Sequence, residues 1–323
     1  MKTRKIFLRR LKTYIVGNKA GTILLVAGLL ILVGGFAYLH QNEWTFVNIV
    51  DDLYANFGSE LISIAITVLI IDFLYRRGEE IQLKAQLIRE ISSANNGFAR
   101  RAVSQLDAHG WLTDGSLRNA NLEKADLAGV NLEEAHLETA NLREANLQDT
   151  NLSRANLSEA NLFKACLIGA KLHRSKFEDA GLFGANLKDA NLSEANLERT
   201  YLEEADLTNA NLIKTNLTDT RLAKTNLTRA DLSKANLTRA RLWRANLERA
   251  ILWAANLEEA NLEEANLKQV DLAGANLRKA NLVGTNLEGA DLENAVLEGV
   301  VYDSTTIWPE GFIPISDCSI RNC

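Results

Sequence analysis

Apolar and polar residues alternate with a period of five over the larger part of this chain. From Leu117 to Leu297 an apolar residue recurs at every fifth position, which gives 37 consecutive pentads, and it is Leu everywhere except at Phe177. Two residues earlier stands a small residue, usually Ala, and the residue between the two is mostly Asn or Asp. A period of five fits neither the 3.6-residue turn of a helix nor the two-residue alternation of a strand. The pattern therefore predicts short extended segments joined by corners.

The geometry of one pentad follows from this spacing. The small residue and the Leu lie two positions apart, so an extended backbone points both to the same side. That side is predicted to be the interior, because it carries nearly all the apolar area. The intervening Asn or Asp points outward, where its side chain can bond nearby backbone, and the last two, mostly polar residues turn the chain. A chain that turns the same way every five residues forms coils that stack into a solenoid.

This pattern resembles the pentapeptide-repeat family, whose motif is A(N/D)LXX. The match covers residues 116–300 in unbroken register. The resemblance implies an all-β solenoid, a right-handed quadrilateral β-helix with four pentads per coil. On that fold the pentads make about nine coils, and at roughly 4.8 Å between stacked strands the rod is about 44 Å long.

Two apolar stretches near the N-terminus predict a transmembrane hairpin. Gly21 to Leu39 is a run of 19 residues without a charge, and about 20 apolar residues cross a hydrocarbon core of roughly 30 Å. The run is longer than the apolar region of a cleavable signal peptide, which favours a retained anchor. A second stretch, at about 53–75, has Glu60 and Asp72 near the ends of its apolar centre. We expect these carboxylates at the headgroup level, and the alternative is that they face a partner helix. The predicted helices cover about 20–39 and 53–75.

The distribution of basic residues predicts the orientation of this hairpin. Seven Lys and Arg residues and no acid lie in 1–19, while no Lys or Arg occurs between His40 and Tyr75. Arg76 and Arg77 close the second stretch. The positive-inside rule then places both termini in the cytoplasm and the short acidic loop outside. We predict a multi-pass membrane protein whose β-helix is cytoplasmic, and the family resemblance implies a bacterial inner membrane, plasma or thylakoid.

A helical linker is predicted between the anchor and the repeats. Leu83, Leu87 and Ile91 fall on one helix face, and the polar run 92–97 interrupts the pattern before a second helix. The linker fits a rigid spacer or a dimerising stalk, so a homodimer stays open. The predicted parts are a membrane anchor (1–78), a helical linker and N-terminal cap (79–110), the β-helix (111–301) and a C-terminal cap and tail (302–323).

Both ends of a stacked coil need a lid, because open backbone edges and a column of Leu side chains would otherwise meet water. The predicted N-terminal lid consists of Phe98, Val103, Leu106, Trp111 and Leu112. The predicted C-terminal lid consists of Val300, Val301, Tyr302, Ile307, Trp308, Phe312 and Ile315. The stretch Trp308–Phe312 (WPEGF) resembles the tail that follows many such repeats.

The sequence offers no constellation for catalysis. The histidines (His40, His109, His136, His173) match no metal-ligand spacing, and the cysteines (Cys166, Cys318, Cys323) form no disulfide framework. No nucleotide-binding loop or nucleophile motif occurs. The pairs of Glu occupy turn positions on a convex surface, where solvation is the simplest role. We therefore predict no catalytic, cofactor-binding or metal site, and no enzyme.

One side of the predicted rod departs from the repeat pattern. With four pentads per coil, residues 20 positions apart stack in columns. Two neighbouring columns then collect aromatic and arginine residues where Asn is usual elsewhere, a combination that interaction hot spots favour. The candidate partner-binding face consists of Phe163, Phe183, Tyr201, Arg221, Arg241 and Trp243. A second irregularity replaces four successive Asn or Asp residues by Cys166, Lys171, Lys176 and Gly181, with Phe177 in place of Leu inside the same coil. We expect this coil to bulge locally, either as a defect or as a contact.

These observations favour a non-enzymatic, membrane-anchored scaffold that presents a rigid rod to an unknown protein partner. The alternative is a DNA-mimicking modulator of a topoisomerase or other DNA-binding protein, a role known in the family. Residues 116–300 carry 22 Lys and Arg against 28 Asp and Glu, with a basic belt at 221–249. This mixed charge departs from a uniformly acidic mimic, and the net negative charge of the chain argues against general affinity for nucleic acid.

Overall fold

The structure is a computed structural model that describes residues 47–314. The chain divides into two compact units, Met1–Leu83 and Lys84–Cys323. The first predicted membrane span, at 20–39, lies outside the described residues, as does Ile315 of the predicted C-terminal lid. The two-helix hairpin therefore stays a prediction.

One long helix, α3, covers Val47–Ile91. It includes the second predicted span and continues without a break through Gly78 into the stretch that we expected to be a separate linker helix. Large apolar side chains of its middle part are exposed, among them Ile64, Ile70 and Leu74. Within the described residues, α3 is the one helix that is long and apolar enough to cross a membrane. Asp72 accepts a hydrogen bond from Arg76 of the same helix at 3.1 Å.

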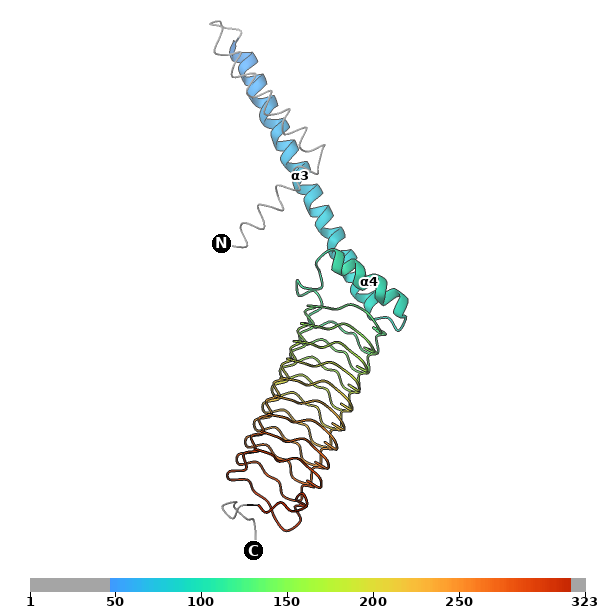
Figure 1. Cartoon of the computed structure of the whole chain (residues 1–323). Coiled ribbons are helices and arrows are strands. Elements are labelled where there is room, and N and C mark those ends of the chain that lie inside the picture. The colour runs from blue at the N-terminus through green and yellow to red at the C-terminus, as the bar shows by residue number, and fades with distance from the viewer. Residues whose placement is uncertain (1–46, 315–323) are drawn as a thin grey trace. The chain divides into compact units, whose positions relative to one another are not determined.

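A shorter helix, α4 (Asn96–Ala108), closes the N-terminal end of the repeats (Figure 1). Asn95 caps it by accepting the backbone N–H of Gly97 at 2.9 Å. Its buried residues are Ala99, Ala102, Val103 and Leu106, which recur at helical spacing and join Trp111 and Leu112 in the core. Phe98 was wrongly predicted to be part of this lid. It is 48% exposed, because the buried stripe of α4 uses small Ala residues where the helix approaches the first coil.

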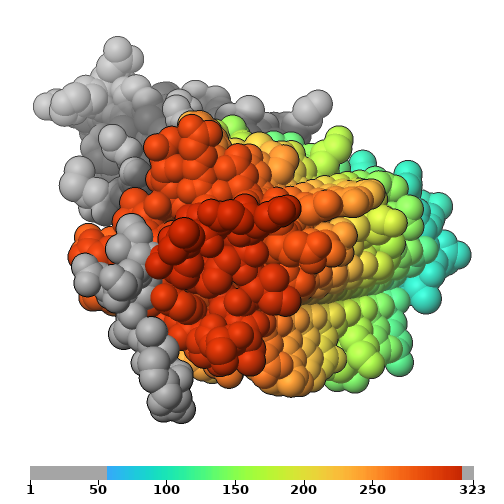
Figure 2. Space-filling model, turned by 60° about the horizontal axis from the view of Figure 1, so that its bottom comes forward, coloured from blue at the N-terminus to red at the C-terminus, as the bar shows by residue number. Residues whose placement is uncertain are grey.

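Residues 117–300 form a stack of coils that runs from green to red in Figure 1. From Asn121 to Asn281, single-residue parallel bridges join each pentad to the pentad 20 positions later, for example Asn121 to Asn141 and Asn141 to Asn161. Four pentads therefore make one coil. Figure 2 looks toward the C-terminal end, and ridges of side chains run along the stack from one colour to the next.

The hydrogen bonds of one pentad account for all five of its backbone N–H groups. In the pentad Ala140–Glu144, Ala140 donates to the carbonyl of the preceding Leu at 3.1 Å and closes a β-turn. Asn141 donates to the previous coil at 2.9 Å, and Leu142 and Glu144 donate to the next coil at 2.7 and 2.8 Å. The N–H of Arg143 has no backbone partner and donates to Oδ1 of Asn141 at 3.3 Å. The Asn of the motif thus supplies an acceptor that the backbone lacks.

The last residue of each pentad adopts a left-handed conformation. Glu144 has φ 56°, Arg239 has φ 56° and Ala254 has φ 53°, and Gly occupies the same position at Gly169 and Gly274. A positive φ at the third residue is the mark of a type II turn, and it strains any residue with a Cβ. The repeat tolerates this strain because every corner is fixed by a turn bond and by bonds between coils.

The interior contains the Leu and small residues of every pentad, as the sequence predicted. Leu227 and Leu242 are 1% and 0% exposed. Where Thr replaces Ala inside, its hydroxyl donates to the carbonyl of the inward Leu or Phe of the previous coil, as Thr220 does to Leu197 at 2.7 Å. The predicted bulge at Phe177 is wrong. Phe177 is fully buried, and its N–H donates to the next coil at 2.7 Å as in a regular pentad, because its ring points along the same interior direction as Leu.

The C-terminal lid is built from the predicted aromatic residues. Tyr302 and Trp308 pack edge to face with 5.4 Å between ring centroids, and Phe312 stacks on Trp308 at 5.2 Å. Tyr302 and Trp308 also pack against the core. Ile307 was expected to point inward but is 50% exposed. Its N–H and carbonyl continue the ladder of backbone bonds instead.

Candidate partner-binding face

The outward Asn and Asp residues form ladders along the rod. Between residues 121 and 291, every Asn or Asp at this position accepts, through Oδ1, the backbone N–H two residues later. Many Asn side chains also donate to the Asn one coil away, as Asn141 does to Asn121 at 3.0 Å. These ladders complete the hydrogen bonding of the surface.

One column of this surface has a gap in its ladder. From Asn161 to Asn261 the bridged residues are Gly181, Tyr201, Arg221 and Arg241. None of the four has an acceptor that could replace Oδ1 of Asn. Within the described residues, the backbone N–H groups of the residues two positions later form no hydrogen bond. Between 121 and 296, no other column has two neighbouring replacements. We call the four stacked pentads that contain these residues (180–184, 200–204, 220–224 and 240–244) the ladder gap.

Aromatic rings line the ladder gap, and cationic side chains cover them. The guanidinium of Arg221 lies over the ring of Tyr201 at 4.5 Å from its centroid, and that of Arg244 lies over Trp243 at 4.5 Å. At the N-terminal end, Phe163 and Phe183 stack with 5.8 Å between centroids. The structure therefore brings the six residues of the predicted face to one side of the rod.

Their exposure is uneven. Tyr201 and Phe183 are 39% and 37% exposed, while Phe163 and Trp243 are half-buried. Outward positions of the repeat predict exposed side chains, and Phe163 and Trp243 are less exposed than that. Phe163 lies beneath the guanidinium of Arg143, which is 4.3 Å from the ring centroid. Neighbouring cations thus cover part of the aromatic surface, a detail that single positions in the sequence do not show.

The ladder gap also holds two arginines that form no direct ion pair among the described residues. Many cations on the rod pair with an acid one coil away, such as Lys224 with Glu204 at 3.5 Å and Arg244 with Glu264 at 2.5 Å. Arg221 and Arg241 form no ion pair with any described residue. On the neighbouring side, the two hydrogen bonds from Arg239 hold the pKa of Asp219 below its usual value, and the charge of Arg241 contributes to this shift. The unpaired guanidinia make the middle of the ladder gap locally basic.

Sequence reasoning missed a second departure, on the side two pentads away. Ile251 occupies an Asn position and is 40% exposed, next to Trp253 at 45%. Lys234 lies over the ring of Trp253 at 4.7 Å from its centroid. The sequence does contain a sign of this departure, because Ile251 stands at a pentad position that is usually Asn or Asp. This departure is confined to one coil, because Ile251 is bridged to Asp231 in the previous coil and to Asp271 in the next.

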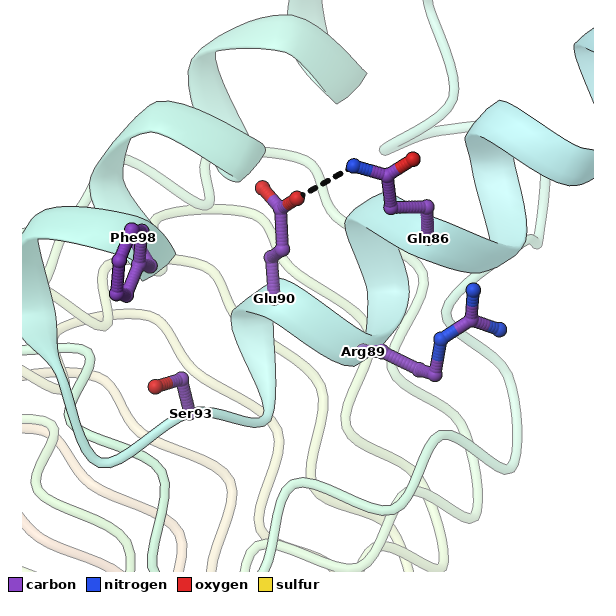
Figure 3. Close-up of a pocket in the computed structure, with 5 residues that line it drawn as sticks. All are labelled: Gln86, Arg89, Glu90, Ser93 and Phe98. Atoms are coloured by element: carbon purple, nitrogen blue, oxygen red, sulfur yellow. Dashed lines mark hydrogen bonds between the residues drawn. The ribbon is translucent and has the colours of Figure 1, made fainter.

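A hollow lies where α3 ends and α4 begins (Figure 3). Gln86, Arg89 and Glu90 of α3, Ser93 of the connecting turn and Phe98 of α4 line it, with about 370 Å³ of open volume. Gln86 donates to Glu90 at 2.8 Å, and Arg89 extends away from Phe98. The hydroxyl of Ser93 accepts the backbone N–H of Asn95 at 3.0 Å and forms no hydrogen bond with Glu90.

The described residues include no group of His, Cys, Asp and Glu that could hold a metal ion. His109 stacks on Trp111 with 4.3 Å between centroids, and His173 shares a hydrogen bond with Ser193 at 2.9 Å. Cys166 is a half-buried free thiol. His40, Cys318 and Cys323 lie outside the described residues.

Comparison with known proteins agrees with this architecture. The family model described as pentapeptide repeats matches eight copies, over residues 112–143, 140–179, 185–222, 215–253 and 255–294, which together cover more than half of the chain. No curated protein matches the chain. Among solved structures, the chain is 36% identical to HetL, a pentapeptide repeat protein involved in heterocyst differentiation regulation from the cyanobacterium Nostoc sp. strain PCC 7120. That alignment covers 62% of this chain and 92% of HetL, with a TM-score of 0.31.

Two further solved structures show the range of similarity. Rfr23 from the cyanobacterium Cyanothece 51142 is 34% identical over 36% of this chain and 65% of its own, with a TM-score of 0.27. QnrB1, a plasmid-mediated fluoroquinolone resistance protein, is 18% identical over 49% of this chain and 90% of its own, with a TM-score of 0.26. The repeat motif, the coil of four pentads and the family match agree, and the rod is a right-handed β-helix solenoid. The chain belongs to the pentapeptide-repeat family.

Proposed function

We propose that this chain is a non-enzymatic scaffold of a bacterial inner membrane, plasma or thylakoid. In this proposal, two transmembrane helices, at about 20–39 and 53–75, anchor it with both termini in the cytoplasm. The rod of about nine coils then presents the ladder gap to a protein partner. The observation that carries the proposal is the ladder gap itself.

The ladder gap costs the fold hydrogen bonds that the motif supplies elsewhere. An Asn at each of its four positions would give the next N–H an acceptor, as Asn161 and Asn261 do at the two ends of the gap. Four successive departures in one column, mostly to aromatic and arginine residues, indicate that these positions serve binding at the expense of local stability. Aromatic residues and Arg are also the side chains that contribute most to protein interfaces.

The rest of the rod supports the role of a rigid support. Its interior is filled by Leu and small side chains with exposures near zero, which leaves no internal cleft for a substrate. Ion pairs between coils, such as Arg199 with Asp179 at 2.8 Å, follow its surface. A side chain on this rod keeps its place relative to the next coil, and such placement suits recognition by a partner.

The alternative function, DNA mimicry toward a topoisomerase or another DNA-binding protein, asks for a continuous acidic surface. The middle of this rod instead exposes Arg221, Arg229 and Arg241, none of which pairs with an acid among the described residues. We therefore place the scaffold first. An inhibition assay with purified gyrase tests the alternative, since a mimic would inhibit and a scaffold would not.

The triple variant Tyr201→Ser, Arg241→Ser and Trp243→Ser tests the scaffold. These side chains lie on the surface, so the full chain should keep its melting temperature to within a few degrees. In proximity labelling from the C-terminus in native cells, the variant should lose a subset of the labelled proteins. Trp253→Ser is the matched control, because it removes an exposed tryptophan from the side two pentads away. A folded triple variant that keeps every labelled protein would show that the ladder gap is ordinary surface.

Reporter fusions test the proposed anchor separately. A reporter inserted at residue 48 should read outside, and one fused after residue 323 should read inside. Two reporters on the same side would exclude the hairpin, whatever the result at the ladder gap.

A further inference from the structure

The ladder gap presents hydrogen-bond donors that have no partner among the described residues. The N–H groups of Phe183, Ala223 and Trp243 form no hydrogen bond among the described residues, and the guanidinia of Arg221 and Arg241 add unpaired charged donors beside them. Between 221 and 244 this side of the rod carries four cations and no acid, and two of the four, Lys224 and Arg244, pair with Glu204 and Glu264 on the adjoining coils. A surface of donors calls for a partner rich in acceptors, and carboxylates are the acceptors that pair most strongly with guanidinium.

The spacing of the ladder gap selects the form of such a partner. Arg221 and Arg241 lie on consecutive coils, as do the stacked rings of Phe163 and Phe183, and stacked strands are about 4.8 Å apart. An α-helix laid along the rod repeats every 5.4 Å, so side chains at i, i+4 and i+7 meet successive coils with a drift of about 2 Å over four coils. An extended strand repeats on one face only every ~6.8 Å and would miss about every third coil.

The flanks of the gap favour a protein over nucleic acid. Glu203 lies within the gap one coil before Arg221, and Glu263 and Glu264 follow one coil after Trp243. A nucleic acid places a phosphate at every nucleotide and needs a continuous basic track. The basic stretch of this face instead spans only two coils, which fits a short run of acidic side chains.

We propose that the ladder gap binds an acidic α-helix of a protein partner, laid along the coil stack so that its carboxylates meet Arg221 and Arg241. An apolar residue of the same helix would contact the part of the half-buried Trp243 ring that Arg244 leaves exposed. This inference rests on the proposed scaffold function and specifies the chemistry of the partner. The residues of the ladder gap alone supply the groups that would bind this helix.

A peptide of about four helical turns provides the probe. It carries Glu at i, i+4 and i+7 with Leu beside them, and it is compared with a scrambled peptide of equal composition. Binding to the full chain in nanodiscs is followed by fluorescence anisotropy at rising salt. We expect the helical peptide to bind and the salt to weaken it. The double variant Arg221→Gln and Arg241→Gln should weaken binding about tenfold or more. The matched control, Lys188→Gln and Arg229→Gln, removes two cations from the neighbouring side and should leave binding unchanged.

Several results would overturn the inference. Equal binding of the scrambled peptide would exclude a helix, and equal loss in the control variant would show that only net charge matters. Tighter binding of a single-stranded oligothymidine would identify a nucleic-acid surface instead. If the peptide does not bind but the triple variant of the previous section still loses labelled proteins, the inference fails and the scaffold stands.

Discussion

The guanidinium of Arg221 lies over the ring of Tyr201, 4.5 Å from the ring centroid, although 20 positions separate the two residues in the chain. The coil of four pentads makes such residues direct neighbours, because it returns to the same side after 20 residues. Neither residue continues the Asn ladder that its column has at Asn161 and Asn261. The pair therefore exchanges the hydrogen bonds of the motif for a cation–π contact.

Repairing the ladder should stabilise the rod. In the triple variant Tyr201→Asn, Arg221→Asn and Arg241→Asn, each new Oδ1 accepts the free N–H two residues later. Each such bond contributes about 0.5–1.5 kcal/mol, against about 0.5–1 kcal/mol for the lost cation–π contact. We expect a higher melting temperature by circular dichroism of the full chain in detergent.

The reverse change provides the control for this repair. Asn226→Arg and Asn246→Arg remove two side-chain acceptors from the neighbouring ladder. In the native chain, each Oδ1 accepts the backbone N–H two residues later at 3.2 Å. This variant should melt lower than the native chain. A repaired ladder that melts lower as well would show that Arg and Tyr stabilise the gap in a way that the hydrogen bonds do not explain.

The left-handed corner predicts opposite effects of glycine at two adjacent positions. Ala254 has φ 53°, a conformation that costs a residue with a Cβ about 1–2 kcal/mol. After the entropy that glycine loses on folding, Ala254→Gly should stabilise the chain by roughly 0.5–1 kcal/mol. Ala255 is buried, and Ala255→Gly should destabilise it by about 1 kcal/mol. Urea titration of both variants gives the two values, and equal signs would contradict this assignment of the corner.

Truncating an interior residue should affect stability far more than truncating an outward one. Leu227 is 1% exposed, so Leu227→Ala leaves a cavity and should cost about 2–5 kcal/mol. Glu258 is an outward turn residue, and Glu258→Ala should change stability by less than about 0.5 kcal/mol. Comparable losses of melting temperature at the two positions would reverse the inward and outward assignment.

The sequence predicted the rod and its columns because the repeat leaves little freedom. Once Leu recurs at every fifth position, the inward residues are known, and a coil of four pentads places Tyr201 beside Arg221. The interruption at 92–97 likewise coincides with the end of α3 at Ile91 and the start of α4 at Asn96. These features depend on local pattern alone.

Other features depend on contacts that a pattern does not contain. Phe98 was placed in the lid because it is apolar, but α4 approaches the first coil through Ala99 and Ala102 and leaves the ring outside. The half-burial of Phe163 depends on Arg143, a cation one coil away. The change from apolar to charged residues near Gly78 suggested a boundary between two helices. Such a change affects what surrounds the side chains but does not interrupt the backbone hydrogen bonds of a helix, so α3 continues through Gly78.

An ion pair between coils should make stability depend on pH in a specific way. Arg239 donates two hydrogen bonds to Asp219, at 2.8 and 2.7 Å, and these lower the pKa of the carboxyl. A carboxyl with a lowered pKa stabilises the fold above its unfolded value of 3.8, and this contribution is lost as the pH falls through the folded pKa. Both side chains are partly exposed, so the effect is small.

Asp219→Asn should therefore melt about 1–3 °C below the native chain at neutral pH, and the difference should vanish in acid below the folded pKa of Asp219. Glu159 provides the control, because it occupies the same corner column and forms no ion pair with a described residue. Glu159→Gln should show little difference at either pH. A difference for Asp219→Asn that persists in acid would mean that Arg239 does not stabilise the rod through the charge of this carboxyl. Equal pH dependence in the two variants would attribute the effect to the net charge of the rod.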